Sequence, residues 1–591
     1  MDTAPLRIAN VSGFYGDRHS AMREMLDGGE IDVLTGDYLA ELTMLILGRQ
    51  KQEDPSAGYA RSFLSQLEDC LGTALERGVR IVSNAGGLNP QGLAAAVTEL
   101  GRRLRLPVRV ATVSGDDLLP RLADLRSRGL LRAGDTPPGD RDVTDALTAN
   151  AYLGCRGIVR ALEAGADVVV TGRVTDASLV VGPAAWHHGW GPGDLDALAG
   201  ATVAGHVLEC GAQATGGNFS FFAELCDADP AVLDHVGFPL AEVAADGAAV
   251  ITKHPGTGGA VTVGTVTEQL LYELTGSRYG GPDVVTRFDA LSLEQAGPDR
   301  VAISGARGLP AAEWLKVAVN RLGGFRNSMT LPLTGLDIER KAELLRRQLA
   351  PALVAQDVTV TLARTDRADA DTQEEAAALL HLTVKDPDRR RVGKAFTAPV
   401  IELGLASIPG FHATAAPPSP SPYGVYSAAW VPAAEVPQVV GLPDGSTERL
   451  PAPAAAAEAP AGPEPVAPPP WTDDGPTRRA PLGRVAGARS GDKGGVATLG
   501  VYARTDDGFA WLAGFLTPDR LRELLPEARA LPVTRELLPG LRALLFQLPG
   551  LLGEGVAAGT RFDPQAKAVG EWLRSRVVDV PERLLPPEVG A

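Results

Sequence analysis

Five short apolar runs, each followed by a helical pattern, organise the first 180 residues and constrain the fold more than any other feature. The runs predict strands at residues 6–11, 31–34, 80–83, 108–113 and 167–170. Strands that alternate with helices indicate right-handed βαβ units and a parallel sheet. We therefore expect an α/β fold in which a large N-terminal unit is built on a parallel, doubly wound sheet.

The same unit is expected to continue to about residue 445, with a less regular mixture of elements. The predicted strands of this part are residues 248–252, 260–266, 358–363 and 380–384, and the predicted helices are residues 267–274 and 337–350. This pattern is typical of an α/β or α+β continuation rather than of further regular βαβ units.

Residues 451–470 interrupt the folded pattern, because they contain eight prolines and eight alanines. Such a stretch cannot form a strand ladder or a core, and it favours an extended chain. We therefore predict three parts, which are an α/β domain at residues 1–445, a linker at 446–479 and a small α+β domain at 480–591. The last part is predicted to contain strands at 482–488 and 496–504 and helices near 517–529, 533–547 and 565–576.

Composition excludes several functional classes. With 56 basic and 72 acidic side chains the formal net charge is −16, whereas binding to nucleic acid or to an anionic membrane surface needs a basic face. No apolar run is long enough to span a membrane, and residues 1–10 lack the pattern of a signal peptide. The four cysteines form no CxxC pair and are expected to be reduced thiols in the cytoplasm.

Small and polar residues follow each of the five N-terminal strands, where a parallel sheet places its ligands. Glycines there let backbone N–H groups approach a ligand, and the helices that follow favour an anion. The same residues also make turns and helix caps, which would explain about half of them. The candidates at this edge are Asp37 and Asp176 as catalytic carboxylates, and Asp17, Arg18, Asn84 and Arg173 as binding residues, with Asp116 and Asp117 beside them.

Two of only eight lysines lie in glycine-rich loops. Lys253 begins the segment KHPGTGG, where Thr257 adds a hydroxyl, and Lys493 follows Asp492 in the segment RSGDKGG. A lysine among glycines suits an anion-binding loop, although the order of residues is not that of a phosphate-binding Walker loop. Each segment also fits a plain hairpin with a solvated lysine.

His206, Glu209 and Cys210 form a third candidate group, in the segment GHVLEC. A histidine and a glutamate three residues apart share one helix face and can act as a charge-coupled pair in acid–base catalysis. The alternative is a satisfied core histidine. Cys210 is expected to be a small buried apolar residue rather than a nucleophile.

Several of these segments together resemble the acyclic terpene utilisation AtuA family. The resemblance rests on residues 8–18 (IANVSGFYGDR), 32–42 (DVLTGDYLAEL), 83–90 (SNAGGLNP), 171–176 (TGRVTD), 252–259 (TKHPGTGG) and 267–273 (TEQLLYE). It covers residues 6–445, and residues 489–501 resemble the separate ferredoxin-fold domain of that family. Two departures are a longer linker that is richer in Pro and Ala, and the apolar continuation GVAT after Lys493.

The resemblance implies a role in the bacterial catabolism of citronellol, geraniol or branched acids through CoA thioesters, but it assigns no catalytic residue. Carboxylates beside anion-binding loops suit an enzyme that removes a proton next to a carbonyl, as a hydratase, a dehydratase or another lyase does. The substrate expected is a small carboxylate or an acyl-CoA. The alternative is a non-catalytic metabolite-binding or accessory subunit of a CoA-dependent enzyme.

The sequence says less about the cofactor and the oligomeric state. No cofactor is specified, but Mg²⁺ at Asp17, Asp37 and Asp176 is a candidate, because carboxylates with a phosphate-like ligand suit this ion. No nucleic-acid or membrane partner is expected, and the chain is expected to form a homo-oligomer.

Overall fold

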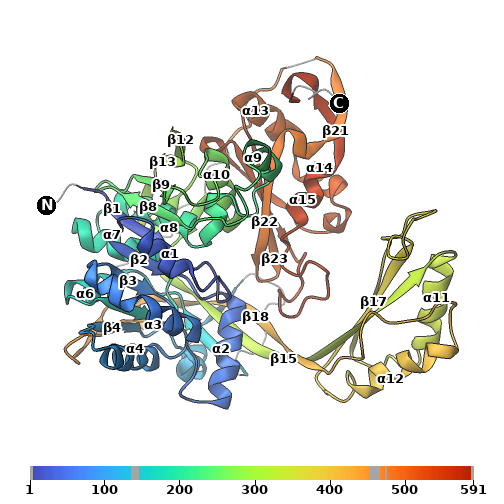
Figure 1. Cartoon of the computed structure of the whole chain (residues 1–591), viewed down its shortest axis with the longest axis horizontal. Coiled ribbons are helices and arrows are strands. Elements are labelled where there is room, and N and C mark those ends of the chain that lie inside the picture. Colours follow the sequence, from blue (N-terminus) through green and yellow to red (C-terminus); the bar gives the residue numbers. More distant parts are fainter. Residues whose placement is uncertain (1–3, 135–144, 453–465, 473–474, 587–591) are drawn as a thin grey trace. The chain divides into compact units, whose positions relative to one another are not determined.

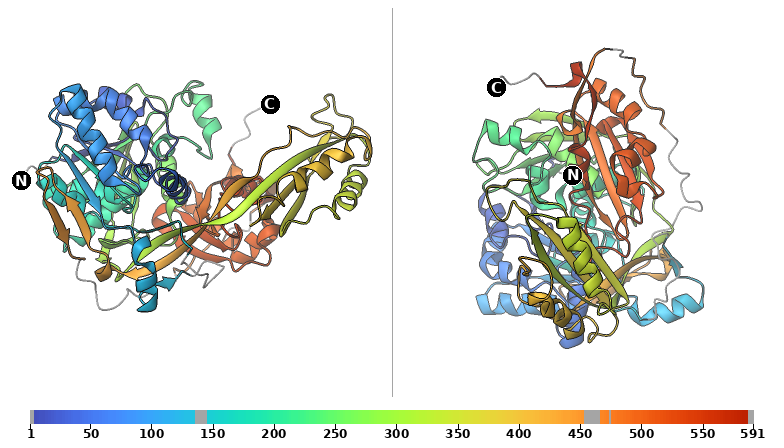
Figure 2. Two further views of the ribbon diagram at one scale, coloured as in Figure 1. Left: turned by 90° about the horizontal axis from the view of Figure 1, so that it is seen from below. Right: turned by 90° about the vertical axis from the view of Figure 1, so that its right-hand side faces the viewer.

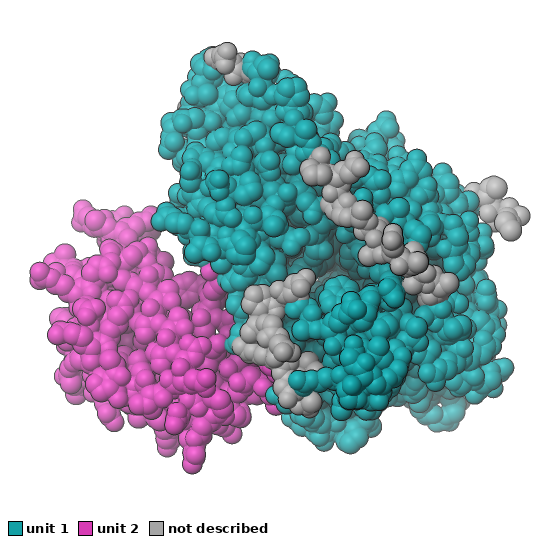
Figure 3. All heavy atoms as spheres, turned by 180° about the vertical axis from the view of Figure 1, so that it is seen from behind, with its two compact units in different colours: residues 1–320, 426–556, 565–591 teal, residues 321–425, 557–564 magenta. Residues whose placement is uncertain are grey.

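The structure is a computed structural model, and it describes residues 4–134, 145–452, 466–472 and 475–586. Two compact units share the chain (Figure 3). Unit 1 comprises Met1–Asn320, Tyr426–Val556 and Gln565–Ala591, and unit 2 comprises Arg321–Val425 and Ala557–Pro564. The predicted boundaries at residues 445 and 480 separate domains that fold independently. The two compact units do not test that prediction.

Five parallel strands form the centre of the main sheet in unit 1 (Figure 1). In spatial order they are β1 (Leu6–Asn10), β2 (Val33–Gly36), β3 (Arg80–Ser83), β7 (Val168–Thr171) and β4 (Val110–Ser114). Their registers are parallel throughout, and all five lie where the apolar runs predicted strands. A parallel centre for the N-terminal fold is therefore confirmed.

Antiparallel strands extend this centre on both sides, so the complete sheet has eleven strands and is mixed rather than purely parallel. Four strands lie beyond β1 and two beyond β4. In order outward they are β8 (Pro239–Val243), β9 (Ala249–Lys253), β13 (Arg300–Ser304) and β12 (Ser292–Gly297), and on the other side β19 (Gln438–Gly441) and β20 (Thr447–Leu450). The doubly wound prediction thus describes only the centre of the sheet.

Successive residues of the central strands pack into two different hydrophobic clusters, as expected for a sheet covered on both faces. Ile8, Val33 and Val82 belong to one cluster, whereas their neighbours Leu34 and Ile81 belong to the other. The first cluster includes residues of α6 (Arg156–Glu163), α7 (Ser178–His188) and α8 (Leu195–Leu208), and the second includes residues of α1 (Ala21–Asp27), α3 (Arg61–Glu76) and α4 (Pro90–Leu104).

The C-terminal part of unit 1 forms its own antiparallel sheet, drawn in orange and red in Figure 2. Its order is β22 (Ala486–Lys493), β23 (Val496–Ala503), β25 (Ala543–Pro549) and β24 (Thr534–Leu538), with a separate ladder of β21 (Thr477–Pro481) and β26 (Val577–Pro581). Its helices are α13 (Asp506–Phe515), α14 (Pro518–Leu524) and α15 (Val569–Arg574). The predicted helix at 533–547 is wrong, because Pro539 and Gly540 break the leucine-rich run into β24 and β25.

Unit 2 is a sheet with helices on one face. Strands β15 (Trp314–Thr334), β17 (Ala377–Asp386) and β16 (Asp357–Ala363) are antiparallel neighbours, and β18 (Ser421–Pro432) belongs to the same sheet. Residues of α11 (Ile338–Leu349) and α12 (Lys394–Glu402) share one hydrophobic cluster with this sheet. β15 and β18 are long strands that continue from unit 1 into unit 2.

The remaining elements connect or edge these sheets. They are α2 (Glu41–Glu53), α5 (Leu122–Ser127), α9 (Phe222–Ala228), α10 (Val263–Glu273), β5 (Arg132–Ala133), β6 (Thr148–Ala151), β10 (Arg278–Gly280), β11 (Val284–Arg287) and β14 (Arg307–Pro310). The described residues thus contain fifteen α-helices and a mixed α/β architecture. Among them, no helix combines the length and the apolar character needed to cross a lipid bilayer.

Candidate acid–base site

Asp37 and Asn84 meet at the carboxyl edge of the central sheet, since each follows a parallel strand. Asn84 Nδ2 donates to Asp37 Oδ1 at 2.6 Å, and the N–H of Tyr38 donates to Asn84 Oδ1 at 2.8 Å. The Asp37 side chain is buried, with 6% of the residue exposed. Burial, together with the negative charge of nearby Asp176, raises the pKa of Asp37 well above its ordinary value. The Asp37 carboxyl therefore keeps its proton to a higher pH than an ordinary aspartate does.

Arg173 and Asp176 follow the neighbouring strand β7 and form an ion pair through Arg173 Nη1 and Asp176 Oδ1. The guanidinium of Arg173 lies 4.3 Å from the centre of the Tyr152 ring. Burial opposes its charge, but Asp176, Tyr152 and Asp37 together hold the pKa of Arg173 above its ordinary value. Its Nε has no hydrogen-bond partner among the described residues. Arg173 is thus a buried cation whose Nε–H is an unused hydrogen-bond donor among the described residues.

Asp116, which follows β4, positions Arg173. Its Oδ2 accepts the backbone N–H of Arg173 at 2.9 Å and the Asn150 amide at 2.8 Å. Burial raises the pKa of Asp116 to about 6, although these hydrogen bonds favour the ionised form. As expected from the ends of parallel strands, the structure places five predicted residues at one edge of the central sheet, namely Asp37, Asn84, Asp116, Arg173 and Asp176.

His206 and Glu209 lie at the end of α8 and are hydrogen-bonded to each other, with 3.1 Å between His206 Nδ1 and Glu209 Oε1. Burial lowers the pKa of His206 to about 4. Burial and the carboxylates of Glu273 and Asp176 raise the pKa of Glu209 well above its ordinary value. Burial thus shifts both groups toward their neutral forms. Nε2 has no partner among the described residues.

Lys493 reaches this site from the C-terminal part of unit 1. At the end of β22 it donates through Nζ to Glu273 Oε2 at 2.7 Å, and Cys210 Sγ donates to Glu273 Oε1 at 2.9 Å. Burial disfavours both charges. Even so, Glu273 and Glu41 hold the pKa of Lys493 above its ordinary value, and the Lys493 ammonium holds the pKa of Glu273 below it. Lys493 and Glu273 are thus an ionised pair. Cys210, which is partly exposed rather than buried as expected, is one of the hydrogen-bond donors to Glu273.

Glu41, Lys316 and Asp492 complete the group. Lys316 Nζ lies 3.9 Å from Glu41 Oε1 and 5.0 Å from the centre of the Tyr152 ring. Burial and the charge of Glu41 raise the pKa of Asp492 to about 7. The acid–base cluster is defined by ten residues, namely Asp37, Glu41, Arg173, Asp176, His206, Glu209, Glu273, Lys316, Asp492 and Lys493.

The acid–base cluster is buried at one end and open to solvent at the other. His206 and Glu209 are 4% and 6% exposed. In contrast, 28% of the Asp176 side chain, 29% of Lys493 and 31% of Lys316 are exposed. A small molecule could therefore contact the exposed carboxylate and ammonium groups, while the buried Glu209 and His206 lie beneath them.

Sequence reasoning missed Glu41, Glu273 and Lys316. Glu41 and Glu273 lie within two of the segments that resemble the AtuA family, and Lys316 is another of the eight lysines. Those signals could have drawn attention to them. Their contacts, however, join α2, α10 and β15, which no local motif connects.

Asp17 and Arg18 form local contacts after β1. Asp17 accepts the backbone N–H groups of Gly13 and Arg18 at 2.9 and 3.0 Å, which closes the turn. Arg18 pairs with Glu24 at 2.6 Å. Arg18 also donates to the backbone oxygen of Val236 at 2.8 Å and lies 4.8 Å from the centre of the Phe238 ring. The proposed contact of Asp17 and Arg18 with an anion remains a prediction.

Lys253 and Thr257 stabilise their own loop. Lys253 Nζ lies 3.1 Å from Asp299 Oδ2 and donates to the backbone oxygen of Thr257 at 2.7 Å. The Thr257 hydroxyl donates to the backbone oxygen of His254 at 2.7 Å. Lys253 and Lys493 therefore have different partners.

Among the described residues, no group of side chains matches the predicted Mg²⁺ site. Within residues 4–134, 145–452, 466–472 and 475–586, no three His, Cys, Asp or Glu side chains are arranged to hold a metal ion. The carboxylate of Asp17 is used in its turn, and that of Asp176 pairs with Arg173. We therefore derive no step through a metal.

Comparison with known proteins adds the family context. The family model described as acyclic terpene utilisation family protein AtuA matches residues 6–442, and the model described as AtuA ferredoxin-like domain matches residues 480–579. No curated protein and no solved structure matches the chain. The first match covers well over half of the chain, and both agree with the resemblance seen in the sequence.

Proposed function

The chain belongs to the acyclic terpene utilisation AtuA family, and from this we propose that it is an enzyme that moves a proton next to the carbonyl of a branched carboxylate or its acyl-CoA thioester. Membership suggests a role in acyclic terpene utilisation. The observation that carries the catalytic part is the acid–base cluster, in which carboxyls of raised pKa, a histidine of lowered pKa and three cations lie together.

Asp176 is proposed as the base. Its carboxylate pairs with Arg173 and is partly exposed, so it can accept a proton from the carbon beside a carbonyl. The electron pair left on that carbon moves to the carbonyl oxygen and forms an enolate. Lys493, whose pKa is held above its ordinary value, supplies a positive charge that stabilises the enolate oxygen.

Asp37 and Glu209 are proposed as proton donors. Burial raises the pKa of both carboxyls, so each keeps its proton to a higher pH than an ordinary carboxyl does. A protonated carboxyl can deliver its proton to a leaving hydroxyl or to an alkene carbon, which is the second half of a dehydratase or hydratase reaction. The same arrangement serves other lyases that begin with an enolate.

The experiment is exchange of the α-proton with solvent, because it does not depend on which later step the enzyme performs. The full chain is incubated in D₂O with citronellate and, separately, with citronellyl-CoA, and the deuterium content is measured by mass spectrometry. We expect incorporation into at least one of the two. Asp176→Asn should slow exchange by about 100-fold or more, within the usual contribution of a general base.

Asp229→Asn is the matched control, because it makes the same chemical change in an exposed turn whose contact lies outside the acid–base cluster. It should leave the exchange rate within about twofold of the unaltered chain. Saturable binding of either compound without exchange or turnover would replace the proposal with the alternative of a metabolite-binding accessory subunit. Absence of both binding and exchange would reject this substrate class.

A further inference from the structure

The sheet of unit 2 has one apolar face and one polar face. Met329, Leu331 and Leu380 pack with α11 and α12 in one hydrophobic cluster. On the opposite face, cross-strand partners on β15 and β17 are polar, with Ser328 opposite Thr383 and Thr330 opposite His381. Because side chains alternate along a strand, this face presents a row of hydroxyls and an imidazole.

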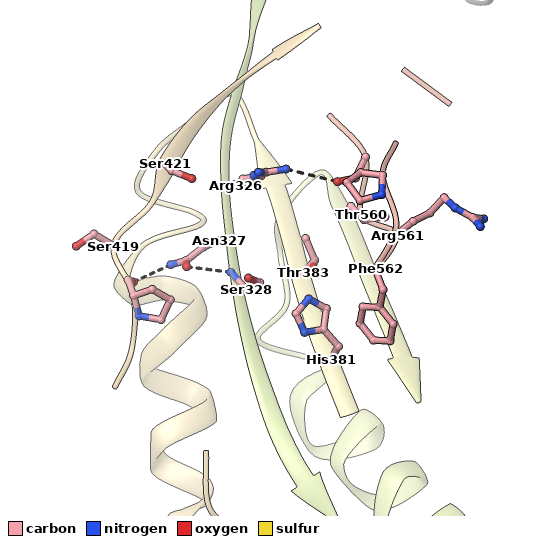
Figure 4. Close-up of a pocket in the computed structure, with 13 residues that line it drawn as sticks. Arg326, Asn327, Ser328, His381, Thr383, Ser419, Ser421, Thr560, Arg561 and Phe562 are labelled. Atoms are coloured by element: carbon pink, nitrogen blue, oxygen red, sulfur yellow. Dashed lines mark hydrogen bonds between the residues drawn. The ribbon is translucent and has the colours of Figure 1, made fainter. Parts of the chain in front are cut away.

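Residues 557–564, which the chain contributes from between β25 and α15, cover part of this polar face (Figure 4). Arg326 Nη1 donates to the backbone oxygens of Ala557 and Gly559 at 3.1 and 3.4 Å. The Thr359 hydroxyl lies 3.4 Å from that of Thr560. The segment is thus held to the sheet by polar contacts rather than by a continuous apolar core.

A pocket of about 380 Å³ lies between the polar face and this segment. No Asp or Glu lines it. Its lining includes five hydroxyl groups, those of Ser328, Thr383, Ser419, Ser421 and Thr560. Such a volume is large enough for a small organic molecule.

Several of these polar groups have unused hydrogen-bonding capacity. Nε and Nη2 of Arg326, and the hydroxyls of Ser328 and Thr383, donate no hydrogen bond to another described residue. Arg326 also pairs with no carboxylate there. Arg561 extends away from the sheet in Figure 4. Lys385, the cross-strand partner of Arg326, lies 3.0 Å from Asp357 Oδ2 and donates to the backbone oxygen of Ala558, so its charge is already paired.

We propose that this pocket binds the phosphate group of a small phosphate ester, with Arg326 as the cation and the surrounding hydroxyls as donors. A guanidinium with free donors matches phosphate oxygens in a planar, two-point contact. Phe562, which is 62% exposed and lies beside His381, offers an apolar ring to the organic part of the ester. None of these residues belongs to the acid–base cluster, so the site is additional to the proposed catalytic one.

The test uses the full chain and two probes, inorganic phosphate and AMP, with binding measured by titration calorimetry. We expect AMP to bind more tightly than phosphate, because the pocket is larger than the phosphate group alone. Arg326→Gln should weaken AMP binding at least tenfold. Arg340→Gln, which removes the same charge from an exposed position on α11 of the same unit, should change it less than twofold.

Two further variants distinguish binding in this pocket from a loss of folding and from binding at the acid–base cluster. Thr383→Val removes a hydroxyl with little change in shape, and a threefold or greater loss of affinity is expected without any change in melting temperature. Lys493→Gln, in the acid–base cluster, should leave AMP binding intact. The proposal is overturned if neither probe binds at millimolar concentration, if Arg326→Gln binds as well as the unaltered chain, or if Lys493→Gln alone abolishes binding.

Discussion

Lys493 and Glu273 show how two residues distant in sequence depend on each other for their charge. The Glu273 carboxylate is buried, with 11% of its side chain exposed, and its oxygens accept from Lys493 and Cys210. Without the ammonium, the cost of burying that carboxylate would have no compensation. The pair therefore stabilises the fold and also keeps a positive charge at the acid–base cluster.

The first prediction separates these two roles. Lys493→Met should destabilise the chain by roughly 3 kcal/mol, because it leaves Glu273 buried without its cation, and it should abolish the proton exchange described above. The double variant Lys493→Met/Glu273→Gln should recover most of the stability in urea unfolding, because residue 273 then carries no charge that needs the ammonium. It should not recover exchange. Recovery of exchange in the double variant would show that the ammonium has no catalytic role.

Glu268 gives a pH dependence whose sign can be stated. Its carboxyl on α10 accepts the N–H of Ser220 at 3.0 Å and the hydroxyl of Tyr502 at 3.2 Å, and burial raises its pKa to about 7. Between its ordinary pKa near 4.5 and about 7, the folded chain binds a proton that the unfolded chain releases. The contribution of Glu268 to stability is therefore full below this window and is lost as the pH rises through it.

The second prediction follows from that sign. On going from pH 5 to pH 8, the unaltered chain should lose up to roughly 3 kcal/mol more stability than Glu268→Gln, because the variant has no carboxyl to titrate. Urea unfolding at the two pH values measures the difference. Glu294→Gln, at an exposed position, is the control and should follow the unaltered chain. Parallel behaviour of Glu268→Gln and the unaltered chain would contradict the assignment.

At the scale of elements, two glycines let the C-terminal sheet approach α10 closely. A Cβ on Gly500 of β23 would lie 2.5 Å from Leu271 Cβ, and one on Gly491 of β22 would lie 2.8 Å from the Tyr272 ring. Both distances are shorter than carbon atoms tolerate. This close packing sets the position of β22, and therefore of Lys493 at its end.

The third prediction uses this contact. Gly500→Ala should destabilise the chain by about 1–3 kcal/mol through overpacking and should reduce exchange, because β22 and β23 must move from α10. The control is Gly514→Ala, at an exposed position of α13 where a Cβ would meet nothing within 4 Å. It should be neutral or stabilising by about 0.5–1 kcal/mol, since alanine favours a helix. Melting temperatures of the two variants give the comparison, and equal values would contradict the proposed contact.

The sequence predicts the parallel strands well, because each is a buried run bounded by helical patterns. It does not predict the antiparallel extensions, since their position depends on pairing between β1 and β8 and between β4 and β19. The run at 533–547 fits a helix by its leucine spacing, and only the turn at Pro539 separates it into strands. Short-range pattern cannot decide between those alternatives when apolar residues are frequent.

The candidate site likewise contains residues that the sequence predicts and residues whose role only the tertiary structure shows. Asp37, Arg173 and Asp176 are found because the ends of parallel strands meet at one edge. Lys253 and Lys493 give the same local signal of a lysine among glycines, yet Lys253 pairs with Asp299 in its own neighbourhood. Only the packing of β22 on α10 distinguishes Lys493, and that packing is a property of the tertiary structure.

At the scale of the whole molecule, the two regions matched by the family models are joined by buried contacts as well as by the chain. The Ser220 hydroxyl exchanges two hydrogen bonds with the backbone of Ala488, at 3.0 and 3.1 Å. Tyr502 reaches Glu268 and Lys493 reaches Glu273. These contacts should hold the two regions together without a peptide bond between them.

The fourth prediction tests this directly. A protease site inserted between residues 456 and 457, in the Pro- and Ala-rich stretch, should yield two fragments that elute together in gel filtration and retain proton exchange. The Lys493→Met variant, cut in the same way, should release its C-terminal fragment more readily, because one buried ion pair is lost. Separation of the unaltered fragments under native conditions would show that the peptide bond is required.

The acid–base cluster has a consequence for the synthesis of the chain. It combines Asp37, near the beginning, with Lys493, which is made 456 residues later. At ribosomal rates of about 5–20 residues per second, roughly half a minute or more separates these two residues. A nascent chain with its first five strands complete thus carries buried carboxyls without Lys493. The proposed activity therefore requires the residues around Lys493, which complete the acid–base cluster long after the parallel strands have been made.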